Sequence, residues 1–177
     1  MYELNQPKYE TFQTQLDHFY VLGISHTENN PAKLGDFWGE YESGKNQILR
    51  DYVNKHSQPG NRLIGVMYSV EQPQEGYFNY ITGGIVEGLS EIPDNSSLVK
   101  FPSTEFLVVT HEWVKTASEA DGFIGMTVGH AHSDEIQGNI PDGYERYNDP
   151  VTFIERFNYN YDENKFRTEI WFAIRKI

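Results

Sequence analysis

Cysteine is absent from the 177-residue chain. Its absence excludes thiol catalysis, zinc-thiolate sites and disulfide bonds, and it fits a protein of the reducing cytoplasm. The chain also lacks an apolar run long enough to cross a membrane. The segment Met1–Gln6 has neither a basic start nor an apolar core for export. We therefore expect a soluble, cytoplasmic protein.

Positive charge is scarce as well. Lys and Arg total 14 against 26 Asp and Glu, which gives a formal net charge of -12, and no basic block interrupts the chain. A surface of this sign repels phosphate backbones and anionic lipids. We expect neither direct nucleic-acid binding nor membrane association.

The first half of the chain predicts the order strand, helix, strand, strand. Apolar residues alternate in Leu16–Ile24, Leu63–Val70 and Tyr77–Val86, as they do in strands, and the turn Gln72–Gly76 joins the last two as a hairpin. Between the first and the second of these strands, Asn29-Asn30-Pro31 is a typical helix start. The apolar stripe behind it reaches Tyr52, with Ser43-Gly44 as a weak point.

The second half predicts the same order. A strand at Glu105–His111 precedes a helix at Ala117–Gln137, and Val151–Tyr159 and Arg167–Arg175 form a closing hairpin. We expect one domain over 1–177, with repeats at about 10–90 and 96–177. The predicted class is α+β: a pseudo-two-fold antiparallel sheet with two helices on one face and a cleft at the seam between the repeats.

One carboxylate lies within an aromatic row in the last hairpin. Alternation places five residues on one face: Val151, Phe153, Glu155, Phe157 and Tyr159. Apolar neighbours favour the neutral carboxyl unless a cation or a hydrogen bond compensates, and a ligand could supply that compensation. The residues alone favour the other interpretation, in which Glu155 reaches solvent at a sheet edge.

Two histidine patterns suggest other chemistry. His130-Ala131-His132 is followed by Asp134, but residues two apart on a helix diverge, whereas a helical metal pair needs a spacing of three or four. His111 at a strand end could act as an acid or base, although a hydrogen-bonded structural role is commoner. We expect no metal and no cofactor.

Four further patterns follow one another over nearly the whole chain. They are Leu34-Gly35-Asp36-Phe37-Trp38; Gly65-Val66-Met67-Tyr68 with Tyr77–Gly84; Phe101-Pro102 before Phe106–Val109; and Ile140–Tyr144 before Phe153–Phe157. Together with Glu169–Ile174, their order and spacing resemble the GyrI-like effector-binding family, the ligand-sensing domain of multidrug-responsive bacterial transcription regulators, which also occurs free-standing.

The resemblance implies a duplicated strand-helix-strand-strand fold and a pocket glutamate at Glu155 that attracts lipophilic cations between aromatic rings. The candidate ligand-binding residues are Glu155, Trp38, Tyr68, Tyr80, Phe106, Phe153, Phe157 and Trp171. About fifteen residues precede the first predicted strand, too few for a helix-turn-helix, so we expect a free-standing member. Asp142 departs from the small hydroxyl residue common in the family, and the glycine-rich second helix matches poorly.

Three functions follow. The favoured one is a small-molecule binding protein that senses or sequesters amphipathic compounds, cationic ones included, in an aromatic pocket around Glu155. The second is a hydrolase of electrophilic small molecules, as some relatives are, with Glu155 as general base and an assisting tyrosine. The third is a protein-interaction module such as a gyrase inhibitor, in which an acidic surface mimics nucleic acid.

Overall fold

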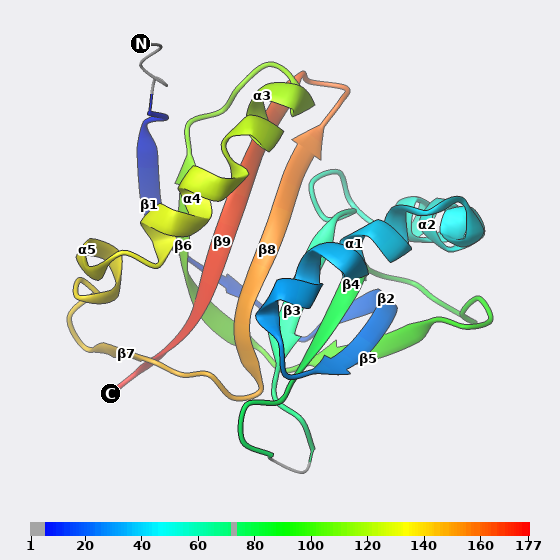
Figure 1. The fold of residues 1–177 in the computed structure, drawn as a ribbon, viewed down its shortest axis with the longest axis horizontal. Coiled ribbons are helices and arrows are strands. Elements are labelled where there is room, and N and C mark those ends of the chain that lie inside the picture. Colours follow the sequence, from blue (N-terminus) through cyan, green and yellow to red (C-terminus); the bar gives the residue numbers. More distant parts are fainter. Residues whose placement is uncertain (1–5, 72–73) are drawn as a thin grey trace.

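A nine-stranded antiparallel sheet runs through the described residues, 6–71 and 74–177, of the computed structural model (Figure 1). The strand order is β1-β6-β9-β8-β3-β4-β2-β5, and β7 pairs with β9 beside this path. The bounds are β1 Tyr9–Leu16, β2 Phe19–Glu28, β3 Ile64–Tyr68, β4 Phe78–Val86, β5 Ser97–Phe101, β6 Thr104–His111, β7 Tyr144–Arg146, β8 Val151–Asn160 and β9 Lys165–Lys176.

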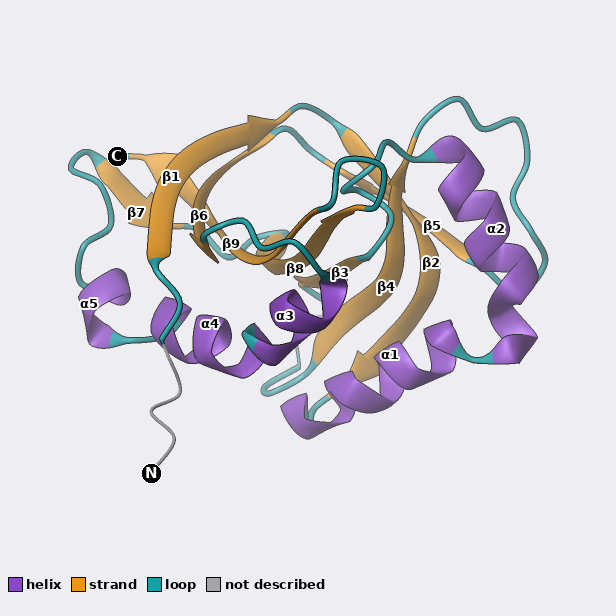
Figure 2. Cartoon of the chain, turned by 90° about the horizontal axis from the view of Figure 1, so that it is seen from above, coloured by secondary structure: helices purple, strands orange, loops and turns teal. Residues whose placement is uncertain are grey.

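The helices form two groups on one side of the sheet (Figure 2). The first group, α1 Leu34–Glu42 and α2 Gln47–His56, packs on β2 and β4. The second group, α3 Ala117–Gly122, α4 Ile124–Ala131 and α5 Asp134–Gln137, packs on β6 and β9 through α3 and α4. Within the described part of the chain, no helix is long and apolar enough to cross a membrane.

The predicted fold class is confirmed, and the two repeats are visible in the sheet. The first is β2, α1 and α2, β3 and β4, and the second is β6, α3 to α5, β8 and β9. They meet where β3 pairs with β8. A further strand precedes each repeat and joins the other half, because β1 pairs with β6 and β5 pairs with β2.

Several predicted boundaries need correction. The predicted strand Leu16–Ile24 spans two elements, because β1 ends at Leu16 and β2 begins at Phe19. Each predicted long helix is divided: the first breaks at the predicted Ser43-Gly44, and the second is split into α3, α4 and α5. Two predictions fall partly outside the described residues. The segment Met1–Gln6, expected to lack an export signal, includes the undescribed residues 1–5, and the predicted turn includes residues 72–73.

Three hydrophobic clusters form the core. One lies on the sheet face away from the helices and includes Val66, Ile154 and Trp171. Two lie on the helix face, one around Leu22 beneath α1 and α2 and one around Phe172 beneath the second helix group. The central strands β3 and β8 run between these two helix-face clusters.

Strand β8 does not keep one alternation along its whole length. Its pairing with β3 shifts between Met67 and Tyr68, so Phe153 packs in the helix-side core while Val151 packs in the opposite core. The prediction that Val151 shares a face with Glu155 is therefore wrong, because a β-bulge turns the strand by one residue.

Candidate functional site

A cavity of about 520 Å³ opens over β8, between α1 and the α3–α4 segment. Strand β8 supplies Glu155, Phe157 and Tyr159, α1 supplies Trp38, and α3 supplies Asp121. The full lining is Leu34, Gly35, Trp38, Glu42, Leu63, Ala117, Asp121, Ile124, Glu155, Phe157, Tyr159 and Tyr161. We refer to this cavity as the central cleft.

Glu155 lies at the centre of the sheet, opposite Gly65 of β3 and Ile170 of β9. Its side chain keeps partial access to the central cleft. Among the ion pairs of the described residues, none involves Glu155. Burial raises the pKa of Glu155 to about 7, and a hydrogen bond from Tyr80 offsets part of the effect. The carboxyl group therefore changes charge near neutral pH.

Tyr80 of β4 is fully buried, and its hydroxyl lies beside Gly65, the residue that pairs with Glu155. Its oxygen accepts a hydrogen bond from Trp38 Nε1 at 3.0 Å, which leaves its own proton for Glu155. Burial and the nearby Glu155 charge raise the pKa of Tyr80, so it stays a hydrogen-bond donor. The indole thus donates to the phenol, and the phenol in turn interacts with the carboxyl group and lowers its pKa.

Gly65 makes this arrangement possible. A Cβ atom at this position would lie 1.9 Å from the Tyr80 hydroxyl oxygen and 3.0 Å from Trp38 Cζ2. Any larger residue would displace Tyr80, which interacts with Glu155, and the Trp38 ring beside it. The glycine on β3 is therefore part of the site, although it carries no functional group.

Aromatic rings line the central cleft. The Trp38 ring meets Phe157 edge-on at a centroid distance of 5.1 Å, and Phe157 meets Tyr159 edge-on at 5.8 Å. The Tyr159 hydroxyl donates a hydrogen bond to the Asp121 carboxylate. Rings in this geometry can contact a flat ligand through their faces and edges.

The predicted site residues separate into three groups. Glu155, Trp38 and Phe157 line the central cleft, and Tyr80 lies beneath it. Phe153 is on the same face but packs in the neighbouring core, beside His132.

Three other predicted residues do not share the cleft. Tyr68, Phe106 and Trp171 belong to the core on the opposite face of the sheet. Tyr68 there meets Phe101 edge-on, and Phe106 meets Trp171 edge-on. They support the sheet that carries Glu155 and cannot contact a ligand in the central cleft.

Sequence reasoning missed Glu42 and Asp121 of the lining. The spacing of these residues in the sequence could have indicated them, because residues three or four apart lie on the same face of a helix. Glu42 lies four residues after Trp38, and Asp121 four residues after the lining residue Ala117.

Glu169 shows how this fold holds a structural carboxylate. It is fully buried on the opposite face and accepts hydrogen bonds from Arg156 at 2.8 Å, Arg167 at 2.6 Å, Asn158 at 3.0 Å and Trp171 at 2.9 Å. Burial alone would raise the pKa of Glu169, but the two guanidinium groups hold it below its ordinary value. No Lys or Arg among residues 6–71 and 74–177 compensates Glu155 in this way.

The histidines have structural contacts. His111 is fully buried, its Nε2 accepts a hydrogen bond from the Thr168 amide at 2.9 Å, and its Nδ1 lies 2.7 Å from the Glu112 carbonyl. Because a carbonyl only accepts, Nδ1 carries the proton and the ring is neutral. His130 stacks on Tyr9, whereas His132 packs edge-on against Phe172.

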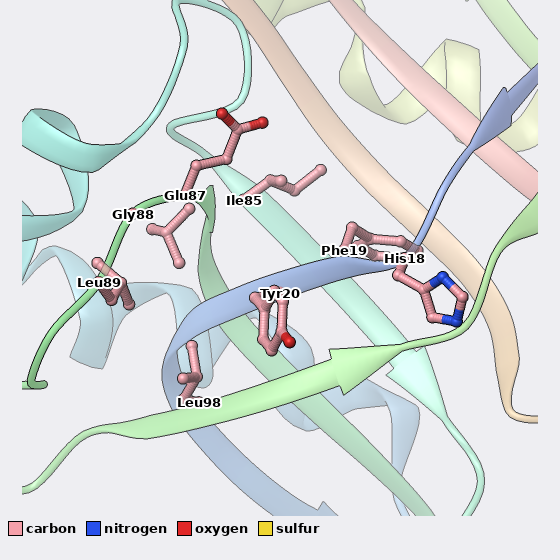
Figure 3. A pocket seen from close by; sticks show the side chains of 9 residues that line it. His18, Phe19, Tyr20, Ile85, Glu87, Gly88, Leu89 and Leu98 are labelled. Carbon is pink, nitrogen blue, oxygen red and sulfur yellow. The ribbon is translucent and has the colours of Figure 1, made fainter.

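A second cavity, of about 470 Å³, lies near the sheet edge formed by β2 and β5. Figure 3 shows Tyr20 of β2 beside Leu98 of β5, with the Glu87 carboxylate directed away from them. Both Tyr20 and Leu98 are 39% exposed. This cavity offers apolar surface without a buried charged group in its lining, so its chemistry is less specific than that of the central cleft.

Two repeats around a central cleft define a GyrI-like effector-binding domain. The chain belongs to the Cass2 family of integron-associated effector binding proteins, whose family model matches residues 14–174. No curated protein matches the chain.

Solved structures share the fold at low sequence identity. A protein from Staphylococcus aureus MU50, described as a bacterial transcription regulation protein, superposes with a TM-score of 0.63 at 16% identity, covering 94% of this chain and 98% of that one. The structure of SAV2435 bound to tetraphenylphosphonium superposes with a TM-score of 0.63 at 15% identity, covering 94% of each chain. An integron cassette protein from Vibrio cholerae gives 0.58 at 12% identity, covering 95% and 98%.

Proposed function

We propose that this protein binds amphipathic small molecules that carry a positive charge, in the central cleft, and so senses or sequesters them. The observation that carries the proposal is Glu155: a carboxyl group surrounded by protein, open to an aromatic cleft, with no cationic partner among the described residues. A bound cation would supply the missing partner.

The physical basis is charge pairing in a poorly solvated place. An ion pair in such a site is stronger than in water, because less water screens it. The rings of Trp38 and Phe157 beside the carboxyl group add apolar contact and cation-π attraction. The contrast with Glu169 supports a ligand role, because this fold places two arginines against a carboxylate that only holds the structure together.

The tetraphenylphosphonium bound by SAV2435 suggests a probe, since that protein shares the fold. We expect this cation to raise the melting temperature of the wild type at pH 8. At about 100 times its Kd a ligand adds about 2.7 kcal/mol to stability, which moves the melting temperature by roughly 5–10 °C. Tetraphenylborate, of the same shape and opposite charge, should give no such increase.

Glu155→Gln should abolish most of the increase with tetraphenylphosphonium. Glu163→Gln is the matched control, because it removes the same charge from the exposed β8–β9 turn, where Glu163 pairs with Lys165. An equal response of all three proteins, or none in the wild type to any lipophilic cation tested, would refute the proposal.

Hydrolysis is the second candidate, and the titration of Glu155 favours it. A carboxyl group with a pKa of about 7 is suited to act as general base near neutral pH, and the buried Tyr80 hydroxyl beside it would orient the carboxyl group rather than contact the substrate. Incubation with compounds that contain a strained electrophilic ring should then give a product with one added water. Glu155→Gln should stop the turnover while binding survives, and an unchanged compound with the wild type would exclude this activity for the series.

A further inference from the structure

We infer that the central cleft selects elongated dications, with one positive group at Glu155 and a second at the cleft mouth beside Asp121 and Glu42. This inference rests on the proposed function and narrows its ligand class. Among the described residues, those that line the cleft include three carboxylates and no Lys, Arg or His. A single cation leaves two of these three acidic groups without a partner in the ligand.

Asp121 is held in place at the mouth. Its carboxylate accepts a hydrogen bond from the Tyr159 hydroxyl. Burial and the hydrogen bond to Asp121 raise the pKa of Tyr159, so the hydroxyl remains a donor throughout the physiological range. Among the ion pairs of the described residues none involves Asp121, which leaves its charge available to a ligand.

Glu42 approaches from the opposite wall. It is the last residue of α1, one turn beyond Trp38. The nearby Lys45 pairs with Glu40 instead, and none of the ion pairs of the described residues includes Glu42. The two helices that border the cleft thus each place one exposed carboxylate in its lining.

The strand sets the spacing between the charges. Glu155 and Tyr159 lie four residues apart on the same face of β8, which corresponds to about 13 Å at the usual rise of a strand. Since Tyr159 holds Asp121, we take the separation of the Glu155 and Asp121 carboxylates to be on the order of 10–14 Å. Phe157 stands midway between them, with Trp38 against its edge.

A carboxylate at each end of the cleft and an aromatic ring between them fit a ligand with two cationic ends and an apolar or aromatic middle. The inner cation would pair with Glu155 in the protected part of the cleft. The outer cation would remain partly solvated beside Asp121 and Glu42, where exposed ion pairs contribute modestly. Chain length should therefore tune the affinity, since only one range of spacing reaches both ends.

A series of bis-pyridinium alkanes of increasing chain length tests the inference, each compared with the N-alkylpyridinium of matched length by isothermal titration calorimetry at pH 8. We expect the best dication to bind roughly three- to tenfold more tightly than its monocation, as one or two exposed ion pairs allow. The gain should peak when the charges are about 10–14 Å apart.

Variants at the mouth separate this inference from the proposed function. Asp121→Asn keeps an acceptor for Tyr159 and should remove most of the dication gain, measured as the ratio of dication to monocation affinity within the same variant. Glu42→Gln should reduce this ratio independently. Glu119→Gln on the same helix, outside the cleft lining, is the control and should retain it.

The possible results distinguish a failure of this inference from a failure of the proposed function. If monocations bind in a Glu155-dependent way but no chain length gives a gain, or the gain survives both mouth variants, this inference fails and the proposed function stands. If neither class of cation binds the wild type, both fail.

Discussion

Replacing Glu155 by Gln should make the ligand-free protein more stable at pH 8, which is unusual for a change at a buried charged residue. The carboxyl group is mostly enclosed by protein, and no described Lys or Arg pairs with it. Glutamine has nearly the same shape and stays neutral, so it removes the cost of holding an unpaired charge in this place.

The magnitude follows from the pKa of Glu155, which rises from an ordinary value of 4.5 to about 7. The folded state holds this proton more tightly than the unfolded state does. The stability it contributes is complete below about pH 4.5 and is lost as the pH rises through about 7. At about 1.4 kcal/mol per pH unit, the loss at pH 8 is at most about 3 kcal/mol.

Urea denaturation of the wild type and of Glu155→Gln at several pH values between 4.5 and 8 would measure this difference. We expect the two curves to coincide at the acidic end and to separate as the pH rises, with the variant up to about 3 kcal/mol more stable at pH 8. In a thermal scan, this corresponds to an increase of up to about 10 °C.

Glu169→Gln provides the opposite control, because it makes the same chemical change on the same sheet. It should destabilise the protein by about 3–5 kcal/mol, since Arg156 and Arg167 would then lack their anionic partner. Equal stability of wild type and Glu155→Gln at every pH, or a less stable variant at pH 8, would show that the Glu155 charge is compensated, and the basis of the proposed function would fall with it.

Three further predictions concern the same framework. Gly65→Ala should cost about 1–3 kcal/mol in chemical denaturation and weaken cation binding, because the new methyl group displaces Tyr80; unchanged stability would contradict the close approach. His111, whose pKa burial lowers, should contribute stability above pH 6.5 that is lost as the pH falls, and its imidazole NMR signals should titrate with a midpoint below pH 6.5. Affinity for tetraphenylphosphonium should rise about tenfold per pH unit below pH 7 and level off above it, as ionisation of Glu155 requires; calorimetry that finds a flat profile would exclude Glu155 as the cation partner.

Periodicity located the strongly patterned elements because their apolar residues face a core on at least one side. Periodicity did not predict strands β1 and β5, because they are edge strands with several exposed or half-exposed residues. Each also pairs with the other repeat, β1 with β6 and β5 with β2. A local pattern contains no information about such an exchange, because it depends on tertiary pairing.

The site was predicted less completely than the fold, for a related reason. Alternation tells which residues share a face within one strand, but not which faces of two strands coincide. Their aromatic side chains make Tyr68 and Trp171 candidates for the wall beside Glu155. The register of β3 and β9 against β8, however, places both residues on the other face of the sheet. Likewise, the bulge that moves Val151 exists only in the pairing of β8 with β3.

The position of Glu155 follows from the duplication itself. Each helix group packs on the outer strands of its own half, α1 and α2 on β2 and β4, and α3 and α4 on β6 and β9. The central strands β3 and β8 therefore face the opening between the groups, where the central cleft lies. The two strands are unequal there, because β8 carries Glu155 where β3 carries Gly65. A second side chain at Gly65 would occupy the space that the Tyr80 hydroxyl and the Trp38 ring fill. This difference between the two strands thus places one buried carboxyl group in the gap between the two repeats.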